Sequence, residues 1–128
     1  MKFKTLMVIK AMVCLGFAPV LLFFPAWILN LVGAAYGTGA ALTAREYGAA
    51  LAGTLLLTWL ARNVDQGVAR KAIIWDLFVY DAIGLDFTVA LILNGTLNAL
   101  GWGIAAVYLV FTVGFGYFAL GGGRKQPE

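Results

Sequence analysis

The stretch Leu97–Leu120, LNALGWGIAAVYLVFTVGFGYFAL, contains no charged residue and decides the class of this chain. A helix of about 20 residues crosses a hydrocarbon core of roughly 30 Å, so this stretch is long enough to span a bilayer. The stretch therefore predicts a membrane-spanning helix.

Three further apolar stretches come before it, at about 71–93, 41–61 and 6–29. The whole chain has 128 residues, of which 62% are hydrophobic and 12% charged, and its mean hydropathy is +0.91. Four crossings with short connections use nearly all of it. We therefore expect an all-α integral membrane protein, a four-helix transmembrane bundle forming a single domain over 1–128, with a mobile tail at 121–128.

Prolines and glycines mark the interruptions. Pro19 and Pro25 lie inside the first span, and a kink or break is expected near each, because proline removes a backbone donor and clashes one turn back. A short tilted or interfacial continuation is expected from Pro25 to Val32. The run Asn94-Gly95-Thr96 predicts a turn between the third and fourth spans.

The basic residues predict the orientation. With four spans, both termini and the second connection lie on one side of the membrane, and that side holds eight of the nine: Lys2, Lys4, Lys10, Arg62, Arg70, Lys71, Arg124 and Lys125. Arg45 alone lies toward the other side. Since basic residues favour the cytoplasmic side, both termini are expected there, in a multi-pass protein of a bacterial cytoplasmic membrane. The tryptophans agree, because Trp27 and Trp102 fall near the outer ends of their spans and Trp59 and Trp75 near the inner ends.

The N-terminus has a second interpretation. Lys2 and Lys4, followed by an apolar run and small residues, resemble a secretory signal peptide. Lys10 interrupts that run and no clear small-x-small cleavage site follows. An uncleaved first span is the leading prediction, and cleavage is the alternative.

The composition excludes most catalytic chemistry. There is no histidine and no serine, and Cys14, the one cysteine, lies inside an apolar span, where a thiol is not activated. No metal site, cofactor or catalytic residue is therefore predicted, and an enzyme using carboxylates on a lipid substrate is a distant third possibility. No basic patch interleaved with aromatic residues suggests nucleic acid. The expected partners are the lipid bilayer and either a membrane protein or a second copy of the chain.

Small residues predict where helices approach closely. Ala40, Ala44, Gly48 and Ala52 form a four-residue ladder on the second span, and Ala49 and Gly53 repeat that spacing beside it. The fourth span has Gly101, Ala105, Gly114 and Gly116. Such surfaces permit tight contacts in lipid, either inside the bundle or between two copies.

Six ionisable residues fall within the spans: Lys10, Arg45, Glu46, Asp76, Asp81 and Asp86. A charge at the centre of a membrane helix costs about 2.5–3.5 kcal/mol, so these groups are expected to avoid lipid. Comparison of their depths predicts two interhelical ion pairs, a structural pair of Lys10 with Asp76 and a second pair of Arg45 with Asp86.

These pairs would leave Glu46 and Asp81 without basic partners. Of the two, Asp81 lies near the middle of its helix. Asp81 is therefore the foremost functional candidate, and Arg45, Glu46, Asp81 and Asp86 are expected to line a polar cavity. Successive aspartates five residues apart point about 140° from one another, so no acidic relay along one face is expected. Two interpretations stay open: the charges hold helices together, or they bind a proton, cation or ligand.

Several segments resemble those of an uncharacterised family of small four-span bacterial integral membrane proteins. They are Ala44-Arg45-Glu46-Tyr47-Gly48, Trp59-Leu60-Ala61-Arg62-Asn63, Asn98-Ala99-Leu100-Gly101-Trp102 and Gly114-Phe115-Gly116-Tyr117-Phe118. The resemblance covers roughly the last two-thirds of the chain. It implies the four-span bundle and carries over no activity.

The leading functional hypothesis is a non-enzymatic membrane protein that is a component of a membrane complex or binds a small or lipidic ligand. The alternative is a small homodimeric transporter coupled to protons or cations, with Asp81 as its titrating site.

Overall fold

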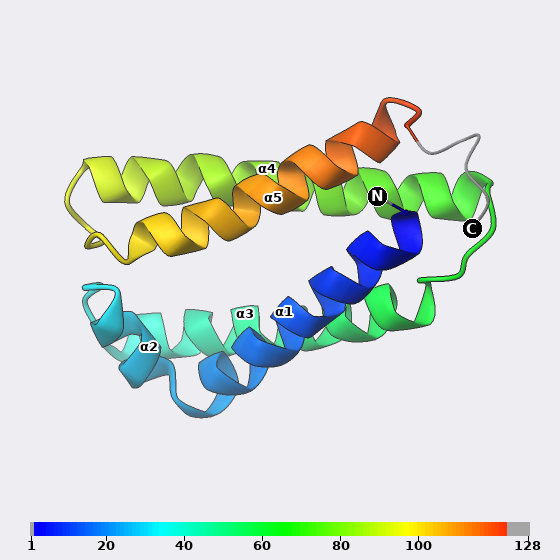
Figure 1. Ribbon diagram of the computed structural model, residues 1–128. Helices are drawn as coiled ribbons and strands as arrows, with labels where there is room; N and C mark the ends of the chain where they lie inside the picture. The colour runs from blue at the N-terminus through cyan, green and yellow to red at the C-terminus, as the bar shows by residue number, and fades with distance from the viewer. Residues whose placement is uncertain (1, 123–128) are drawn as a thin grey trace.

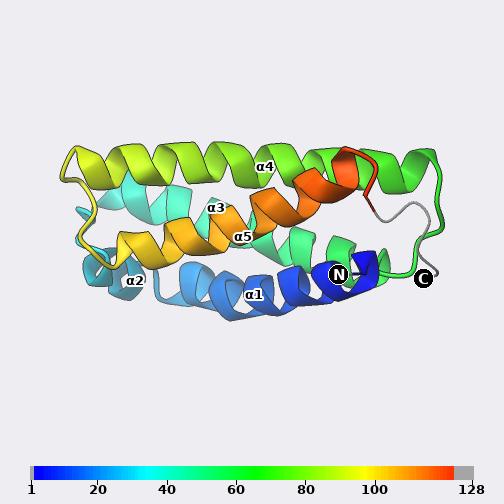
Figure 2. The same cartoon turned by 45° about the horizontal axis from the view of Figure 1, so that its top comes forward.

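The protein is all-α, and the computed structural model describes residues 2–122. The described part contains five helices and no strand: α1 (Phe3–Phe23), α2 (Pro25–Leu31), α3 (Thr38–Leu60), α4 (Val68–Leu93) and α5 (Gly101–Ala119). Figures 1 and 2 show them as two hairpins, α1 beside α3 and α4 beside α5, with the short α2 at the turn of the first. The part of the predicted mobile tail from residue 123 onward lies outside the described residues.

The break predicted at Pro25 is confirmed. Helix α1 ends at Phe23, and Phe24 has a φ of −131°, so its backbone leaves the helix before Pro25 begins α2. Proline suits the first position of a helix, where its missing N–H would have no partner anyway. At Pro19 the helix continues, since Pro19 lies inside α1. The stretch expected as one span up to Leu29 is therefore a long helix followed by a short, separate one.

Glycine permits the close packing predicted for α3. A Cβ at Gly48 would lie 3.0 Å from Leu21 Cβ and 3.0 Å from Leu22 Cγ, so the absence of a side chain lets α1 approach. At Gly53 a Cβ would meet nothing within 4 Å. The ladder of small residues therefore packs against α1 at Gly48, and Gly53 lies outside this contact.

The second hairpin uses glycine in the same way. A Cβ at Gly84 of α4 would lie 2.5 Å from the Tyr108 ring, and one at Gly114 of α5 would lie 2.9 Å from Leu6 Cδ2. The glycine on α4 was not singled out from the sequence, although it is the one that brings Tyr108 against that helix.

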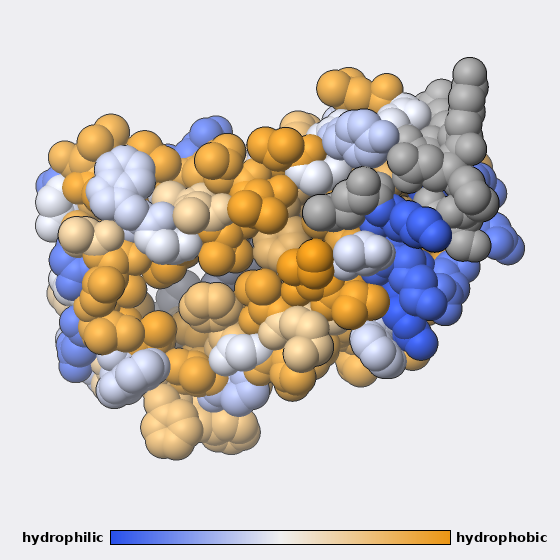
Figure 3. All heavy atoms as spheres, in the orientation of Figure 1, coloured by the Kyte–Doolittle hydropathy of each residue, from blue (hydrophilic) through white to orange (hydrophobic). Residues whose placement is uncertain are grey.

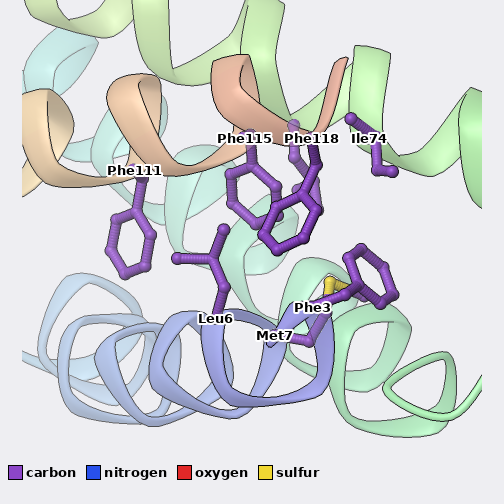
Figure 4. Close-up of a cluster of buried hydrophobic side chains, with 8 residues drawn as sticks. Phe3, Leu6, Met7, Ile74, Phe111, Phe115 and Phe118 are labelled. Atoms are coloured by element: carbon purple, nitrogen blue, oxygen red, sulfur yellow. The ribbon is translucent and has the colours of Figure 1, made fainter. Parts of the chain in front are cut away.

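The two hairpins meet in a core of aromatic and aliphatic side chains at the end where the chain begins. It is formed by Phe3, Leu6 and Met7 of α1, Ile74 and Leu77 of α4, and Phe111, Phe115 and Phe118 of α5. Figure 4 shows the α1 side chains pointing toward the phenylalanines of α5. The rings of Phe3 and Phe118 are 5.7 Å apart and nearly perpendicular. This core holds the hairpins together at one end.

At the opposite end the hairpins are joined by hydrogen bonds instead. Asn98 donates from its side-chain nitrogen to the Leu31 carbonyl at 2.9 Å and from its backbone N–H to the Val32 carbonyl at 2.8 Å. The Asn98 side chain also accepts from the Leu100 N–H. Residues 97–100, which were expected to be the first turn of a helix, therefore form a connection, and α5 begins only at Gly101.

The predicted turn at Asn94 is confirmed. The Asn94 side-chain oxygen accepts hydrogen bonds from the backbone and the hydroxyl of Thr96, at 3.0 Å and 2.7 Å. Gly95 has a φ of +86°, a conformation that residues with side chains rarely adopt.

Two helices in the described chain, α1 and α5, are long and apolar enough to cross a membrane by length and composition. The most apolar windows of α1 and α5 have mean hydropathies of 2.3 and 1.6. Figure 3 shows apolar side chains over most of one face, with hydrophilic ones at both ends and the larger group of them at the end where the chain begins.

Candidate ligand-binding site

A buried ion pair joins the two hairpins. The Lys10 ammonium of α1 donates to Asp81 Oδ1 of α4 at 2.5 Å, and the two residues are 3% and 0% exposed. The ammonium also lies 4.9 Å from the centre of the Tyr80 ring and 4.5 Å from that of Phe111. Electron-rich ring faces attract a cation, so the rings supplement the carboxylate. Asp81 Oδ2 is buried and accepts no hydrogen bond from residues 2–122.

The sequence-based pairing of Lys10 with Asp76 is wrong. Lys10 pairs with Asp81, the residue that the sequence appeared to leave without a partner, and Asp76 is exposed. The two aspartates lie five residues apart and point about 140° from each other, so only one faces α1. The error came from matching depths along the helix without knowing which face of α4 turns inward.

The structure also shows no ion pair between Arg45 and Asp86. Both side chains are exposed, and Arg45 Nε donates to the backbone carbonyl of Leu22 at 3.3 Å. Glu46 is exposed as well. Of the four residues expected to line a polar cavity, Asp81 alone is buried, and the other three lie on the outer surface of the two hairpins.

A chain of three tyrosine hydroxyls lies beside the ion pair, one from each of three helices. The Tyr80 hydroxyl of α4 donates to that of Tyr47 of α3 at 2.6 Å, and the hydroxyls of Tyr47 and Tyr108 of α5 are 2.5 Å apart. The Tyr47 and Tyr80 rings stack at 6.4 Å. We call these three residues the tyrosine triad. Together with the ion pair, the triad links both hairpins at mid-length.

A cavity of about 460 Å³ lies between the hairpins and is bordered by Lys10 and the tyrosine triad. Its polar end contains Lys10 and the tyrosine triad, and Cys14 and Thr43 also line it. Its other lining residues are apolar: Val13, Phe17, Leu21, Ile28, Leu29, Val32, Ala34, Ala35, Ala40, Ala44, Leu51, Leu97, Ile104 and Val107. Figure 3 shows the face hollowed where α1 and α5 diverge. Cavities that bind small molecules are commonly about 300–1,000 Å³ and are apolar with a few polar groups.

None of the four residues predicted to line the cavity does so; its polar side chains are Lys10, the three tyrosines, Cys14 and Thr43. The meeting of the three tyrosines was not predicted, because Tyr47 lies 33 and 61 residues from the other two in sequence and no spacing rule connects them. One signal was available. A buried tyrosine hydroxyl usually has a hydrogen-bond partner, so tyrosines inside apolar spans predict a polar contact there.

Chemically, the site presents an ammonium group, which donates hydrogen bonds, and hydroxyl groups, which both donate and accept them, in a largely apolar chamber. Within residues 2–122 no three histidine, cysteine, aspartate or glutamate side chains gather as metal ligands would. Comparison of the chain with protein-family models, curated proteins and solved structures gives no match. The geometry of this cavity is therefore the basis for inferring a function.

Proposed function

We propose that this protein is a non-enzymatic, four-span integral membrane protein that binds an amphipathic, lipidic ligand in the cavity between its two hairpins. The ligand's apolar chain occupies the apolar chamber, and its polar end meets Lys10 and the tyrosine triad. The observation that carries the proposal is the cavity of about 460 Å³, because most of its lining residues are apolar and Lys10 and the tyrosine triad provide most of its polar groups.

The outward-facing side chains support a membrane environment for all four long helices. Beyond α1 and α5, large apolar residues are exposed on α3 and α4, including Leu42, Leu56 and Leu60 on α3 and Ile83 and Phe87 on α4. A water-soluble helix would present polar residues on that face. Lipid would cover these side chains without further protein.

The length of α4 determines how deep its aspartates would lie in a bilayer. Its 26 residues extend about 39 Å at 1.5 Å per residue, about 9 Å more than a hydrocarbon core of roughly 30 Å. If the excess is shared between the ends, Asp76 and Asp86 lie roughly 6–8 Å inside the boundaries, and therefore away from the middle of the bilayer, where a charge costs most. Asp81 lies at the middle of the helix, where it is paired with Lys10.

The distribution of basic residues supports the proposed orientation, with both termini on the cytoplasmic side of a bacterial inner membrane. Lys4, Arg62 and Arg70 line one surface pocket at the end where the chain begins. Basic residues gathered at one end are what the positive-inside rule associates with the cytoplasmic face.

Native mass spectrometry of the protein, extracted gently from its own membrane, tests the proposal. We expect a bound lipid-sized mass at one per chain. Ile104→Trp should weaken or remove it, because Ile104 lines the cavity and a larger side chain there takes up part of the chamber. Val113→Trp is the matched control, since Val113 is exposed on the same helix.

Two outcomes would contradict the proposal. If no mass is bound and no added amphiphile binds, the cavity is not a ligand site. If a second protein accompanies the chain at fixed stoichiometry and no lipid does, the protein is a component of a membrane complex instead.

One observation favours a second candidate, a homodimeric carrier coupled to protons or cations. Asp81 is fully buried, and its Oδ2 accepts no hydrogen bond, so that oxygen is available to a proton or cation. A homodimer that drives Asp81-dependent proton uptake in liposomes would establish this candidate.

A further inference from the structure

A pocket at the end where the chain begins is lined by basic side chains from three different segments. Its volume is about 480 Å³. Lys4 comes from α1, Arg62 from the connection between α3 and α4, and Arg70 from the first turn of α4. The other lining residues are Asn63, Val64, Asp65 and Gln66. We call this the basic pocket. The positive-inside rule requires only that basic residues lie on one side of the membrane, so their convergence on one pocket is a separate observation.

The basic pocket has an excess of positive charge. Asp65 is the one acidic residue in its described lining, against three basic ones. Within residues 2–122, Asp65 forms no ion pair with Lys4 or Arg62. Even when Arg70 is left out of the count, the basic residues outnumber the acidic one. The pocket therefore attracts an anion.

Arg62 is held in an orientation that leaves most of its N–H groups available. Its guanidinium lies 4.0 Å from the centre of the Trp59 ring, and one N–H donates to the Trp59 carbonyl. A guanidinium has five N–H groups, and the others have no acceptor among residues 2–122. Their planar fork matches two oxygens of a phosphate. Lys4, which is exposed, makes no hydrogen bond or ion pair with the described chain, so its ammonium is available as well.

The surroundings of the basic pocket favour a lipid head group over a soluble anion. Trp59, against which Arg62 lies, is 45% exposed, and tryptophan side chains are enriched at the level of the head groups. A second pocket, of about 320 Å³, adjoins the first and shares Gln66 and Arg70 with it. Its lining is partly apolar and includes Val68, Ile74, Phe118 and Ala119. Such a wall suits the start of an acyl chain whose phosphate lies next door.

From the convergence of basic residues, the available N–H groups and the adjoining apolar wall, we infer that the basic pocket binds the phosphate of an anionic phospholipid, such as phosphatidylglycerol, in the cytoplasmic leaflet. The phosphate oxygens accept from Arg62 and Lys4. A zwitterionic lipid is disfavoured, because its ammonium group would lie among basic side chains. The inference takes the membrane and the orientation from the proposed function, and it is independent of the ligand in the cavity between the hairpins.

Native mass spectrometry of the delipidated full chain in a neutral detergent, with lipid added in steps, tests the inference. The probes are phosphatidylglycerol and phosphatidylcholine with identical acyl chains. We expect phosphatidylglycerol to bind at least about 5-fold more tightly, the ratio that one basic residue near a membrane surface provides. Inorganic phosphate at the same concentration as the lipid should not displace it, because it has no chain to place on the apolar wall.

Substitutions that remove one charge separate the basic pocket from the general positive charge of this end. Lys4→Gln and Arg62→Gln should each weaken phosphatidylglycerol binding about 5-fold and leave phosphatidylcholine binding unchanged. Lys2→Gln is the matched control, since Lys2 is exposed at the same end and does not line the pocket, and it should leave binding nearly unchanged. Because Lys4 has no contact that holds the fold, Lys4→Gln stays informative even if Arg62→Gln loosens the end of α3.

Three outcomes would overturn the inference. If phosphatidylcholine binds as tightly as phosphatidylglycerol, the pocket does not select an anionic lipid. If Lys2→Gln weakens binding as much as Lys4→Gln, the basic residues act as diffuse charge and form no site. If inorganic phosphate displaces the lipid, the pocket belongs to a soluble anion.

The failure of this inference and that of the proposed function are distinguishable. Ile104→Trp, which alters the cavity between the hairpins, should leave phosphatidylglycerol binding unchanged. If it abolishes that binding, the bound lipid lies in the cavity, so the inference fails and the proposed function stands. If phosphatidylglycerol binding depends on Lys4 and Arg62 while nothing binds in the cavity, the proposed function fails and the inference stands.

Discussion

Replacing Lys10 by methionine should destabilise the protein by about 3–5 kcal/mol. The substitution removes the charge and keeps an unbranched apolar side chain. It leaves the Asp81 carboxylate, which is fully buried, without its counter-ion, and an uncompensated buried charge is the costly result of breaking such a pair. Lys4→Met is the matched control, because Lys4 is exposed on the same helix and should change stability little.

Asp81→Asn should cost less than Lys10→Met by about 1–2 kcal/mol, for two reasons that the structure supplies. The amide oxygen still accepts from the Lys10 ammonium. That ammonium keeps its position against the rings of Tyr80 and Phe111, at 4.9 Å and 4.5 Å, which stabilise a desolvated cation. The carboxylate left behind by Lys10→Met has no comparable neighbour, since its second oxygen is already without a partner.

The double variant completes the cycle. Lys10→Met with Asp81→Asn removes both charges, so it should be more stable than Lys10→Met alone, with a coupling free energy of up to about 3 kcal/mol. Unfolding by SDS in mixed micelles, followed by circular dichroism, measures all four proteins. Additive effects, or a cost below about 1 kcal/mol for Lys10→Met, would refute the reasoning that this pair is desolvated and coupled.

Two further predictions concern packing and topology. Gly48→Ala should destabilise the contact of α3 with α1 by about 1–3 kcal/mol, because its Cβ meets side chains and backbone at 3.0–3.1 Å. Gly53→Ala, with open space around it, should be neutral or stabilising in the same unfolding assay. In a Cys14→Ala background, single cysteines at Gln66 and Thr96 should be labelled by a membrane-impermeant maleimide from opposite faces of the membrane; labelling of both from one face would exclude four spans.

Some features of the fold could be predicted from the sequence because they depend on local chemistry. The long helices were predicted from long apolar stretches, the break after Phe23 from Pro25, and the turn from Asn94-Gly95-Thr96. The first and last residues of the helices depend also on contacts with distant parts of the chain. The start of α5 shifted to Gly101 because Asn98 uses its backbone and side chain to bind the α2 end of the other hairpin. No property of residues 97–100 alone reveals that distant partner.

The candidate site could be predicted only in part. Its residues come together because of how each helix is rotated about its own axis, as well as because of their depth along the helix. Asp81 was identified as unusual from its position at the middle of a span, and it is buried there. Its partner was assigned wrongly, since the face of α4 turned toward α1 is decided by packing at positions such as Gly84, where Tyr108 approaches. To predict the tyrosine triad, one must know how three helices are rotated relative to one another, and the periodicity of a single helix does not provide that information.

The division into two hairpins has a consequence for how the chain is made. A ribosome completes α1 and α3 before Asp81 is synthesised, so the first hairpin, inserted in the membrane as proposed, contains Lys10 with no counter-ion until α4 follows. The second hairpin made alone would contain Asp81 in the same condition. Each half made alone therefore contains one charge without its partner, and the Lys10–Asp81 contact forms only when the two halves meet.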